Sequence, residues 1–411
     1  MQIKQTVKLL FCALAGLSAW AQPAPGRGGG TPAVRSPEAS ADGRITFRLR
    51  APNAKEVFVT GLAPGQRLAM QKDDQGVWTV TTESMKPDMY GYAFNVDGAS
   101  FNDPGNSNFK TAMVGAGQSQ VHIPGPVSWE PAPGIARGAV AHHFYHSALI
   151  GDNRDFYAYT PPNYEPNRKE AYPVLYLLHG LGDDAAGWIT AGAANVILDN
   201  LIAQGKAKPM VMVNTLGYGV ANMLPAGRGG PGVMGGDKMI PNFAQALIDE
   251  VMPQVEKQYR VTKDRQERAV AGLSMGGAEA LFTGLNHQDK FAWVGSFSGA
   301  FVMWPGAAAG RTPADPPATG GGRGPVTLDT IVFERNFPAL DAKTNKQLKL
   351  LWIACGTDDG LNGVNRQFKA WLKSKDIQFT DVEIPGMAHV WPLWRQNLME
   401  LAPMLFQGKG K

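Results

Sequence analysis

A single serine in a run of small residues constrains the fold of this chain more than any other feature. The stretch RAVAGLSMGGAEAL, residues 268–281, places Ser274 between Gly272 and Gly276. Residues typical of a buried strand precede the serine, and residues that favour a helix follow it. At such a junction the serine occupies a sharp, strained turn, and the glycines let the chain fold back closely. We expect a strand–turn–helix unit whose serine hydroxyl projects beyond a sheet edge; the alternative is a tight turn with an unreactive serine.

The sequence around this serine alternates apolar runs with helical segments. Residues 242–259 repeat an apolar side chain every four positions, as one face of a helix does, and Pro253 is expected to kink or interrupt that helix. The alternation predicts a mostly parallel α/β sheet with helices on both sides. Apolar runs typical of buried strands occur at residues 172–180, 208–217, 267–274, 291–299 and 348–356.

The sequence before this region has a different hydrophobic pattern. In residues 43–50, Ile45, Phe47 and Leu49 alternate with polar residues, as in a half-buried strand, and further short β-rich runs follow between turn residues. This pattern predicts a small all-β sandwich over residues 43–125. The α/β domain is expected over residues 138–408, after a Pro- and Gly-rich linker.

The N-terminus has the features of an export signal. A positively charged start, a short apolar stretch at residues 9–20 and an Ala-Trp-Ala sequence ending at Ala21 predict a signal peptide over residues 1–21. The protein is therefore expected to be secreted or periplasmic, with an uncleaved anchor as the alternative. Residues 22–42, rich in Pro, Gly, Ser and Ala, are expected to form a disordered linker.

Composition narrows the possible partners. The net charge of +4 is small for 411 residues, so a nucleic-acid surface is not expected. After signal cleavage no apolar segment is long enough for a membrane span, and Cys355 is the only cysteine, so no intramolecular disulfide can form. Two aperiodic stretches rich in Gly and Pro, residues 221–238 and 304–329, are expected to be a cleft-lining loop and a mobile insertion.

A serine nucleophile requires a base, and in the α/β-hydrolase order an acid and then a histidine follow the serine. Two histidines follow Ser274. His287 comes too soon, at the polar end of the next helix, whereas His389 lies in a loop after an apolar strand. Two adjacent acids, Asp358 and Asp359, follow a late strand, and spacing alone does not choose between them.

Stabilisation of an oxyanion requires N–H donors aimed at the developing charge. The backbone N–H of Met275 and that of Leu181, in a loop after an early strand, are the expected donors. His179 precedes the serine at a strand end, where bracing of a turn is the expected role. A zinc site at His142, His143 and His146 is the less favoured interpretation of what reads as a strand, and no metal or cofactor is expected.

The second half of the chain resembles the carbohydrate esterase family of feruloyl and acetylxylan esterases, related to esterase D and to mycolyltransferases. The resemblance covers residues 140–406 and implies an α/β-hydrolase fold. It implies that Ser274 is the nucleophile, His389 the base and Asp359 the acid, with Leu181 and Met275 as oxyanion donors. Trp391 also matches and is either a substrate contact or part of the core. The motifs are RDFYAYTPPNYE (154–165), YPVLYLLHGLGDDAAGW, VAGLSMGGAEAL, SGAF (298–301), CGTDDGL and GMAHVWPLWRQNL.

The front region resembles the immunoglobulin-like early-set domain that precedes many glycan-active enzymes. Trp78, the alternation of Tyr90, Tyr92 and Phe94, and the sequence DPGN at residues 103–106 carry this resemblance. Some relatives bind α-glucans through this domain, and others use it only as a packed neighbour. Both roles stay open here, because a fold does not assign a function.

These features together predict a secreted serine esterase that removes acyl groups, feruloyl or acetyl, from plant polysaccharide through an acyl-enzyme. Its partner is expected to be an ester-substituted glycan or a small ester. One alternative is transfer of the acyl group to a sugar alcohol. Another is a non-catalytic glycan-binding protein, which the complete triad argues against. A peptidase is disfavoured because the front region is too short for a propeller. The Gly-rich loops depart from the family pattern, so the acyl group and the alcohol stay open, and the sequence does not indicate an oligomeric state.

Overall fold

The computed structural model of the chain describes residues 34–407, except residues 64, 114–116, 126–128, 131, 222–235 and 308–326. The predicted signal peptide and most of the predicted linker, residues 22–42, lie outside the described residues, as do most residues of the two aperiodic stretches. No helix in the described part is long and apolar enough to cross a membrane.

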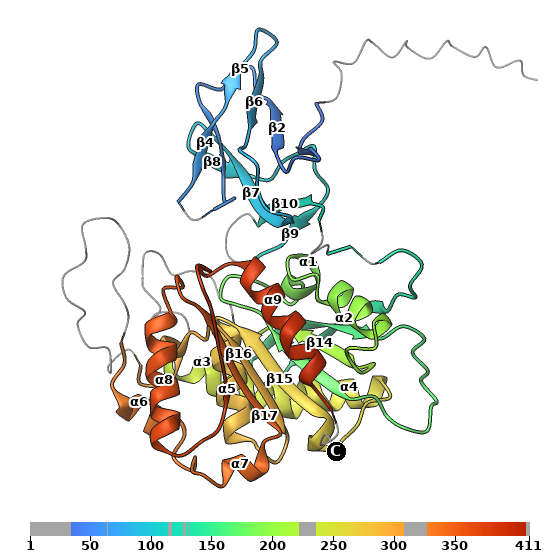
Figure 1. Cartoon of the computed structure of the whole chain (residues 1–411), viewed down its shortest axis with the longest axis vertical. Coiled ribbons are helices and arrows are strands. Elements are labelled where there is room, and N and C mark those ends of the chain that lie inside the picture. The colour runs from blue at the N-terminus through green and yellow to red at the C-terminus, as the bar shows by residue number, and fades with distance from the viewer. Residues whose placement is uncertain are drawn as a thin grey trace, which may run out of the picture. The chain divides into compact units, whose positions relative to one another are not determined.

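The front of the described chain is an all-β sandwich of two antiparallel sheets, drawn in blue to cyan in Figure 1. One sheet has the order β1 (Glu38–Ala39), β2 (Ile45–Arg50), β6 (Val77–Thr81) and β5 (Gln71–Lys72). The other has the order β4 (Arg67–Ala69), β3 (Val57–Thr60), β7 (Asp88–Val96), β10 (Gln118–Ile123) and β9 (Phe109–Lys110), with β8 (Ala99–Phe101) paired to β7.

The core of the sandwich follows from the alternation in β2. Ile45, Phe47 and Leu49 are buried while the residues between them are not. Phe47 packs on Tyr92, with ring centroids 4.6 Å apart, and the Tyr92 hydroxyl donates to Asp103 Oδ2 at 2.7 Å. Because buried polar groups need partners, this bond lets a tyrosine occupy the core.

One difference from the sequence prediction concerns the range expected to be a disordered linker. Its last residues are ordered, because β1 pairs with β2 and the Ser36 hydroxyl donates to Asp103 Oδ2 at 2.6 Å. Ser36 is 67 positions from Asp103 in the sequence, so the composition of the stretch gave no sign of this contact.

The second half is built on one sheet of eight strands. β12 runs antiparallel to both of its neighbours, β11 and β14, and the strands from β14 to β18 run parallel to one another. The order is β11 (Ala139–Ser147), β12 (Asp152–Thr160), β14 (Val211–Thr215), β13 (Val174–Leu178), β15 (Arg268–Leu273), β16 (Trp293–Phe297), β17 (Leu350–Gly356) and β18 (Thr380–Ile384).

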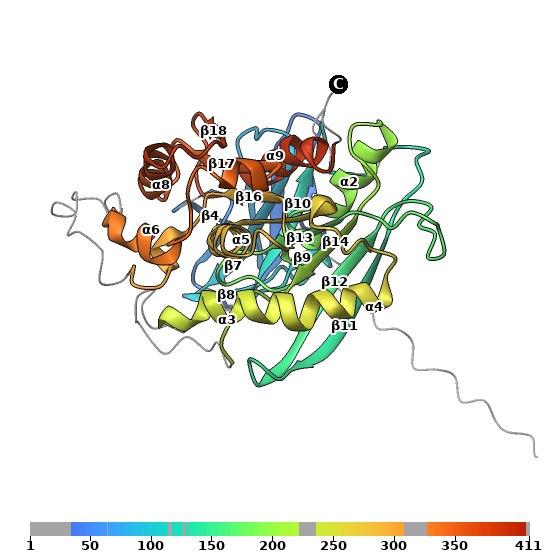
Figure 2. The ribbon, with the colours of Figure 1, turned by 90° about the horizontal axis from the view of Figure 1, so that it is seen from below.

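Helices cover both faces of this sheet because successive side chains of a strand point to opposite faces. Val174, Tyr176 and Leu178 of β13 join a core with α3, α5, α6 and α8, whereas Leu175 and Leu177 join a second core with α2 and α9. Figure 2 shows α3 and α4 on one face and α2 and α9 on the other. The helices are α1 (Gly187–Thr190), α2 (Ala194–Ala203), α3 (Met239–Ala246), α4 (Met252–Gln258), α5 (Met275–Asn286), α6 (Thr330–Asn336), α7 (Thr344–Gln347), α8 (Asn362–Ser374) and α9 (Trp391–Leu401).

The helix expected to be interrupted at Pro253 runs through α3 and α4, which a π-helical turn, Leu247–Val251, joins. Proline has no N–H for the carbonyl four residues earlier, so a regular α-helix would lose a hydrogen bond there. The wider turn accommodates this loss just before the proline.

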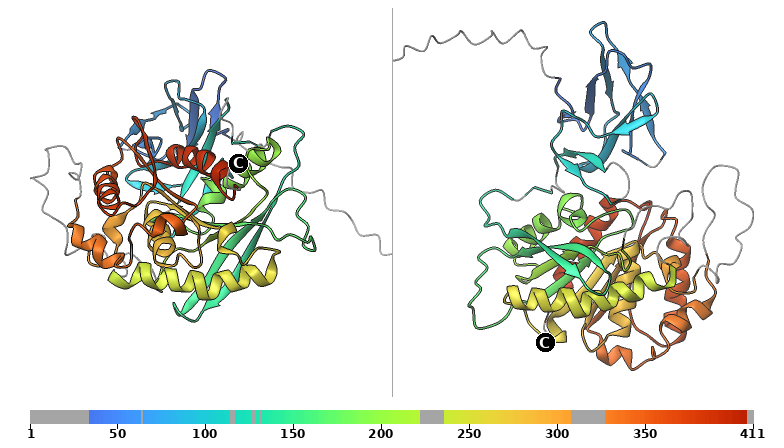
Figure 3. Two further views of the ribbon diagram at one scale, coloured as in Figure 1. Left: turned by 60° about the horizontal axis from the view of Figure 1, so that its bottom comes forward. Right: turned by 180° about the vertical axis from the view of Figure 1, so that it is seen from behind.

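The three clustered histidines belong to β11, which pairs with β12 at the edge of the sheet. Figure 3 shows the long hairpin that these two strands form. His142 contacts Asp155 at 2.6 Å, His143 contacts the Tyr259 hydroxyl at 2.5 Å, and His146 contacts Asn153 at 3.1 Å. Because strand side chains alternate, His143 points away from the other two. Among the described residues no group of three potential ligands surrounds a common point.

Candidate active site

Ser274 stands at a strained corner between β15 and α5. Its backbone φ is 53°, a left-handed value that is costly for a residue with a side chain. A Cβ atom at Gly272 would lie 2.4 Å from the Gly276 carbonyl oxygen, and one at Gly276 would lie 2.5 Å from the Leu178 carbonyl oxygen. Glycine is therefore required at both positions, because any larger residue would push the helix off the sheet.

The structure brings Ser274, His389 and Asp359 into a line of hydrogen bonds. His389 Nε2 is 3.0 Å from Ser274 Oγ, and His389 Nδ1 is 2.8 Å from Asp359 Oδ2. The residues come from loops after β15, β18 and β17, at the carboxyl ends of parallel strands, where open α/β sheets place their sites. With a proton on Nδ1, the imidazole is able to accept the serine proton at Nε2.

Asp359 is suited to hold this imidazole because its carboxylate stays charged. Burial alone would raise the pKa of Asp359, whose side chain is 0% exposed. The hydrogen bond and charge of His389, with the Leu361 N–H and the Ser298 hydroxyl, instead hold the pKa below its usual value. The carboxylate is thus ionised at neutral pH.

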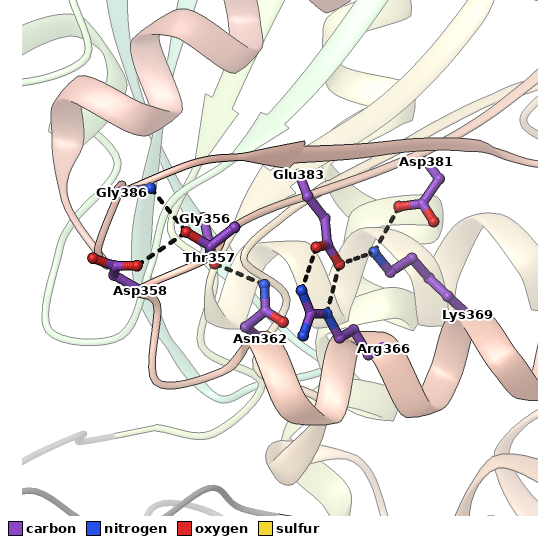
Figure 4. Close-up of polar contacts among 9 residues, drawn as sticks. All are labelled: Gly356, Thr357, Asp358, Asn362, Arg366, Lys369, Asp381, Glu383 and Gly386. Atoms are coloured by element: carbon purple, nitrogen blue, oxygen red, sulfur yellow. Dashed lines mark hydrogen bonds and ion pairs between the residues drawn. The ribbon is translucent and has the colours of Figure 1, made fainter.

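Asp358, the alternative acid, does not contact His389 in the structure. Figure 4 shows its carboxylate accepting a hydrogen bond of 2.9 Å from the Thr357 hydroxyl, which in turn accepts the Gly386 N–H at 2.8 Å. Asp358 is exposed. Through Thr357, its contacts link the loop after β17 to the loop after β18.

A network of ion pairs between α8 and β18, which the sequence did not predict, lies beside the loops that carry Asp359 and His389 (Figure 4). Arg366 of α8 holds Glu383 of β18 through two hydrogen bonds of 2.9 and 2.6 Å. The Arg366 hydrogen bond, with Lys369, lowers the pKa of Glu383 to about 2. Lys369 also contacts Asp381 at 2.6 Å. The sequence held one sign of this network: Arg366 and Lys369 lie three positions apart on a helix, on one face. The two acids, Asp381 and Glu383, lie two positions apart on a strand, also on one face.

The expected oxyanion donors flank the serine. Met275 is the first residue of α5, and the first N–H groups of a helix have no partner within it. Leu181 belongs to the loop after β13, which runs close to the serine: a Cβ atom at Gly180 would lie 3.4 Å from Ser274 Cβ.

His179 braces this loop and does not contact Ser274. Its Nε2 accepts the Gly217 N–H at 2.9 Å, so its Nδ1 carries the proton and donates to the Gly180 carbonyl at 2.8 Å. Burial lowers the pKa of His179 to about 4, so the ring is neutral. His287 caps the far end of α5, about 18 Å from Ser274 by the rise of twelve helical residues.

A cavity of about 940 Å³ opens at the serine. It is lined from the α/β domain by Leu181, Ser274, His389 and Trp391, among others, and from the sandwich by residues of β4, β7 and β9. Trp391 also packs edge-on against Trp188, with centroids 5.3 Å apart. It is thus both a cavity wall and part of an aromatic cluster.

Comparison with known proteins agrees with this architecture. Residues 147–404 match the family described as "Putative esterase", and residues 33–112 match "Carbohydrate-binding module 48 (Isoamylase N-terminal domain)". An "Endo-1,4-beta-xylanase/feruloyl esterase" of Xylanibacter ruminicola is 30% identical over 92% of this chain. This chain spans only 46% of the length of that protein.

Two solved structures are similar. A ferulic acid esterase is 25% identical, with a TM-score of 0.51 over 65% of this chain and 97% of that chain. An enterochelin esterase of Shigella flexneri has a TM-score of 0.61 over 90% of this chain and 95% of its own, and at 18% identity it shows a shared fold.

These matches confirm the α/β-hydrolase fold, the all-β domain in front of it and the resemblance to feruloyl esterases. The match over residues 147–404 covers more than half of the chain. The chain therefore belongs to this family, described as putative esterases.

Proposed function

We propose that this protein is a secreted serine esterase that hydrolyses feruloyl or acetyl esters on plant polysaccharide. The observation that carries the proposal is the line of hydrogen bonds from Asp359 through His389 to Ser274. Each group has the partner that its role requires, and the serine lines a cavity.

The first step forms an acyl-enzyme. Ser274 Oγ attacks the ester carbonyl carbon as His389 Nε2 takes the hydroxyl proton. The carbonyl oxygen becomes an oxyanion, which the N–H groups of Leu181 and Met275 stabilise. Asp359 balances the charge of the imidazolium and keeps its Nδ1 proton in place.

Collapse of the tetrahedral intermediate breaks the bond to the alcohol, which leaves with the proton from His389. Water then attacks the acyl carbon and gives a proton to the same nitrogen. The second intermediate releases the carboxylic acid and returns the proton to Ser274 Oγ. The net reaction consumes one water and yields one acid and one alcohol.

Two observations support the substrate class. The relatives named as feruloyl and ferulic acid esterases match this chain over most of its α/β domain. The cavity of about 940 Å³ is within the usual size of small-molecule sites and is large enough for a phenolic acyl group with an attached sugar. Export is proposed from the N-terminal pattern alone.

An ester panel tests the proposal: methyl ferulate, acetylated xylan and the p-nitrophenyl esters of acetate, butyrate and octanoate. We expect cleavage of methyl ferulate or acetylated xylan, and a loss of about 10⁶-fold in Ser274→Ala. Analysis of the products with free xylose present separates hydrolysis from acyl transfer. Failure of the wild type on every ester, or more than about a tenth of its activity in Ser274→Ala, would contradict the proposal.

A further inference from the structure

The oxyanion loop, residues 180–184, is held by the α/β domain on one side. The Gly182 N–H donates to the Tyr218 hydroxyl at 2.8 Å, and that hydroxyl donates to the Asp183 carbonyl at 2.8 Å. Burial raises the pKa of Tyr218 far above its usual value, so the hydroxyl keeps its proton and acts as a donor.

The β-sandwich holds the same loop from the other side. Lys110 of β9 forms an ion pair with the Asp183 carboxylate, and the Met113 N–H donates to the Gly182 carbonyl at 2.9 Å. Lys110 and Asp183 are 7% and 8% exposed, so the pair is largely shielded from water.

Asp183 connects this ion pair to the orientation of the Leu181 N–H. The Gly180 carbonyl accepts hydrogen bonds from the Asp183 N–H, at 3.2 Å, and from His179 Nδ1. The Gly180 carbonyl and the Leu181 N–H belong to one planar trans peptide and point in opposite directions. Whatever fixes the carbonyl therefore also aims the N–H.

Lys110 is needed for this arrangement because Asp183 is buried. A buried carboxylate without a partner is unfavourable, and the loop would relax to return it to water. Burial lowers the pKa of Lys110 to about 8, against the attraction of Asp184, so the ammonium is still mostly present at neutral pH. The ion pair can therefore form under ordinary conditions.

We propose that Lys110 of the β-sandwich is a positioning residue for ester cleavage, which aims the Leu181 N–H at the oxyanion through its ion pair with Asp183. This inference rests on the proposed serine esterase mechanism. It makes the front domain part of the catalytic apparatus, whether or not that domain also binds glycan.

The test compares Lys110→Met, Asp183→Asn and the double variant with wild type on the best ester of the panel. Rates are expressed per active site, counted by titration with diethyl p-nitrophenyl phosphate. We expect kcat to fall about 10- to 100-fold with KM within threefold, because a displaced donor weakens the transition state and not the substrate complex. The double variant should be no worse than the poorer single variant.

A boronic acid provides a readout that a merely structural role would not change. Phenylboronic acid adds to the catalytic serine as a tetrahedral adduct with one oxygen at the oxyanion position. Its inhibition constant should rise in parallel with the fall in kcat. Lys110→Arg, which keeps the cation, should stay within about fivefold of wild type, and the exposed Lys55→Met should change neither constant.

The outcomes separate the inference from the proposed function. Unchanged kcat and boronate affinity in Lys110→Met, with or without a lower melting temperature, would overturn the inference and leave a docking contact only. A higher KM with unchanged kcat would also overturn it and make Lys110 a substrate contact. If Lys110→Met does not fold, Asp183→Asn, which keeps the side-chain size, decides alone. An inactive wild type would instead reject the proposed function.

Discussion

At the scale of single residues, the site combines a strained serine with a buried carboxylate. Ser274 has a left-handed backbone, and Asp359 is 4% exposed and hydrogen-bonded to the ring that faces the serine. Both features are unfavourable in isolation, and the surrounding sheet and helix hold them in place. Backbone strain and buried charge of this kind are typical of active sites.

The two neighbouring aspartates give the sharpest residue-level prediction. Asp359→Asn should lower kcat by about 10⁴, because an amide no longer holds the imidazole in the tautomer that accepts the serine proton. Asp358→Asn should cost about tenfold or less, since its carboxylate is exposed and contacts Thr357. Both variants are assayed on one soluble ester. If Asp358→Asn instead shows the larger loss of kcat, the assignment of the acid is wrong by one residue.

The pH dependence of kcat/KM follows from which groups are charged. The pKa of Asp359 is held below its usual value and that of His179 is about 4, so both groups have finished titrating by about pH 6. Neither group then contributes to an acid limb above about pH 6, and because a single base takes the serine proton, the logarithm of kcat/KM should have an acid limb of slope one. A limb of slope two, or a rate independent of pH between about 5 and 9, is not compatible with this account.

At the scale of elements, the sequence predicted what local chemistry decides. The small residues around Ser274 indicated the turn, the apolar runs indicated strands β13 to β17, and the position after β18 singled out His389. Residues that meet only through folding were not predictable. Lys110 and Asp183 are 73 positions apart and share no periodic pattern, and the contacts of α8 with β18 depend on sheet order. The choice of Asp359 came from the family resemblance.

The junction of β13, β15 and α5 predicts the effect of one added methyl group. In Gly276→Ala the new Cβ would lie 2.5 Å from the Leu178 and His179 carbonyl oxygens, so α5 must shift away from β13. We expect a loss of about 1–3 kcal/mol in stability and a fall in kcat of about tenfold or more.

The matched control for this variant is Gly187→Ala in α1. A Cβ atom there would meet the nearest atoms of Asp183 at 3.5 Å, an ordinary contact, and alanine favours a helix more than glycine does. Chemical denaturation and the ester assay measure both variants. Equal stability and equal kcat in the two would contradict the steric account of the elbow.

At the scale of the whole described chain, a buried arginine links the sandwich to the α/β domain. Arg395 of α9 is fully buried and donates to Asp88 at 2.6 Å and to the Met89 carbonyl at 2.9 Å, both on β7. Because this ion pair joins the two domains, we expect them to unfold together. Loss of Arg395 would leave the Asp88 carboxylate without its cation and so weaken this link.

Arg395→Met is therefore expected to cost about 3–5 kcal/mol in the free energy of unfolding. The matched control is Arg366→Met, which removes a pair whose arginine side chain is 60% exposed and should cost less than about 1 kcal/mol. Thermal unfolding followed by calorimetry measures both. Two separate transitions in the wild type, or equal losses in the two variants, would show that the domains are not coupled through Arg395.

The central claim is that Ser274 forms the covalent intermediate, and labelling tests it most directly. The protein is treated with diethyl p-nitrophenyl phosphate, which phosphorylates activated serines, and the modified residue is located by peptide mass spectrometry while residual activity on methyl ferulate is followed. We predict one diethylphosphoryl group per chain, on Ser274, with activity lost in proportion to labelling. Loss of activity with the label on another residue, or full activity in the chain labelled at Ser274, would contradict the account.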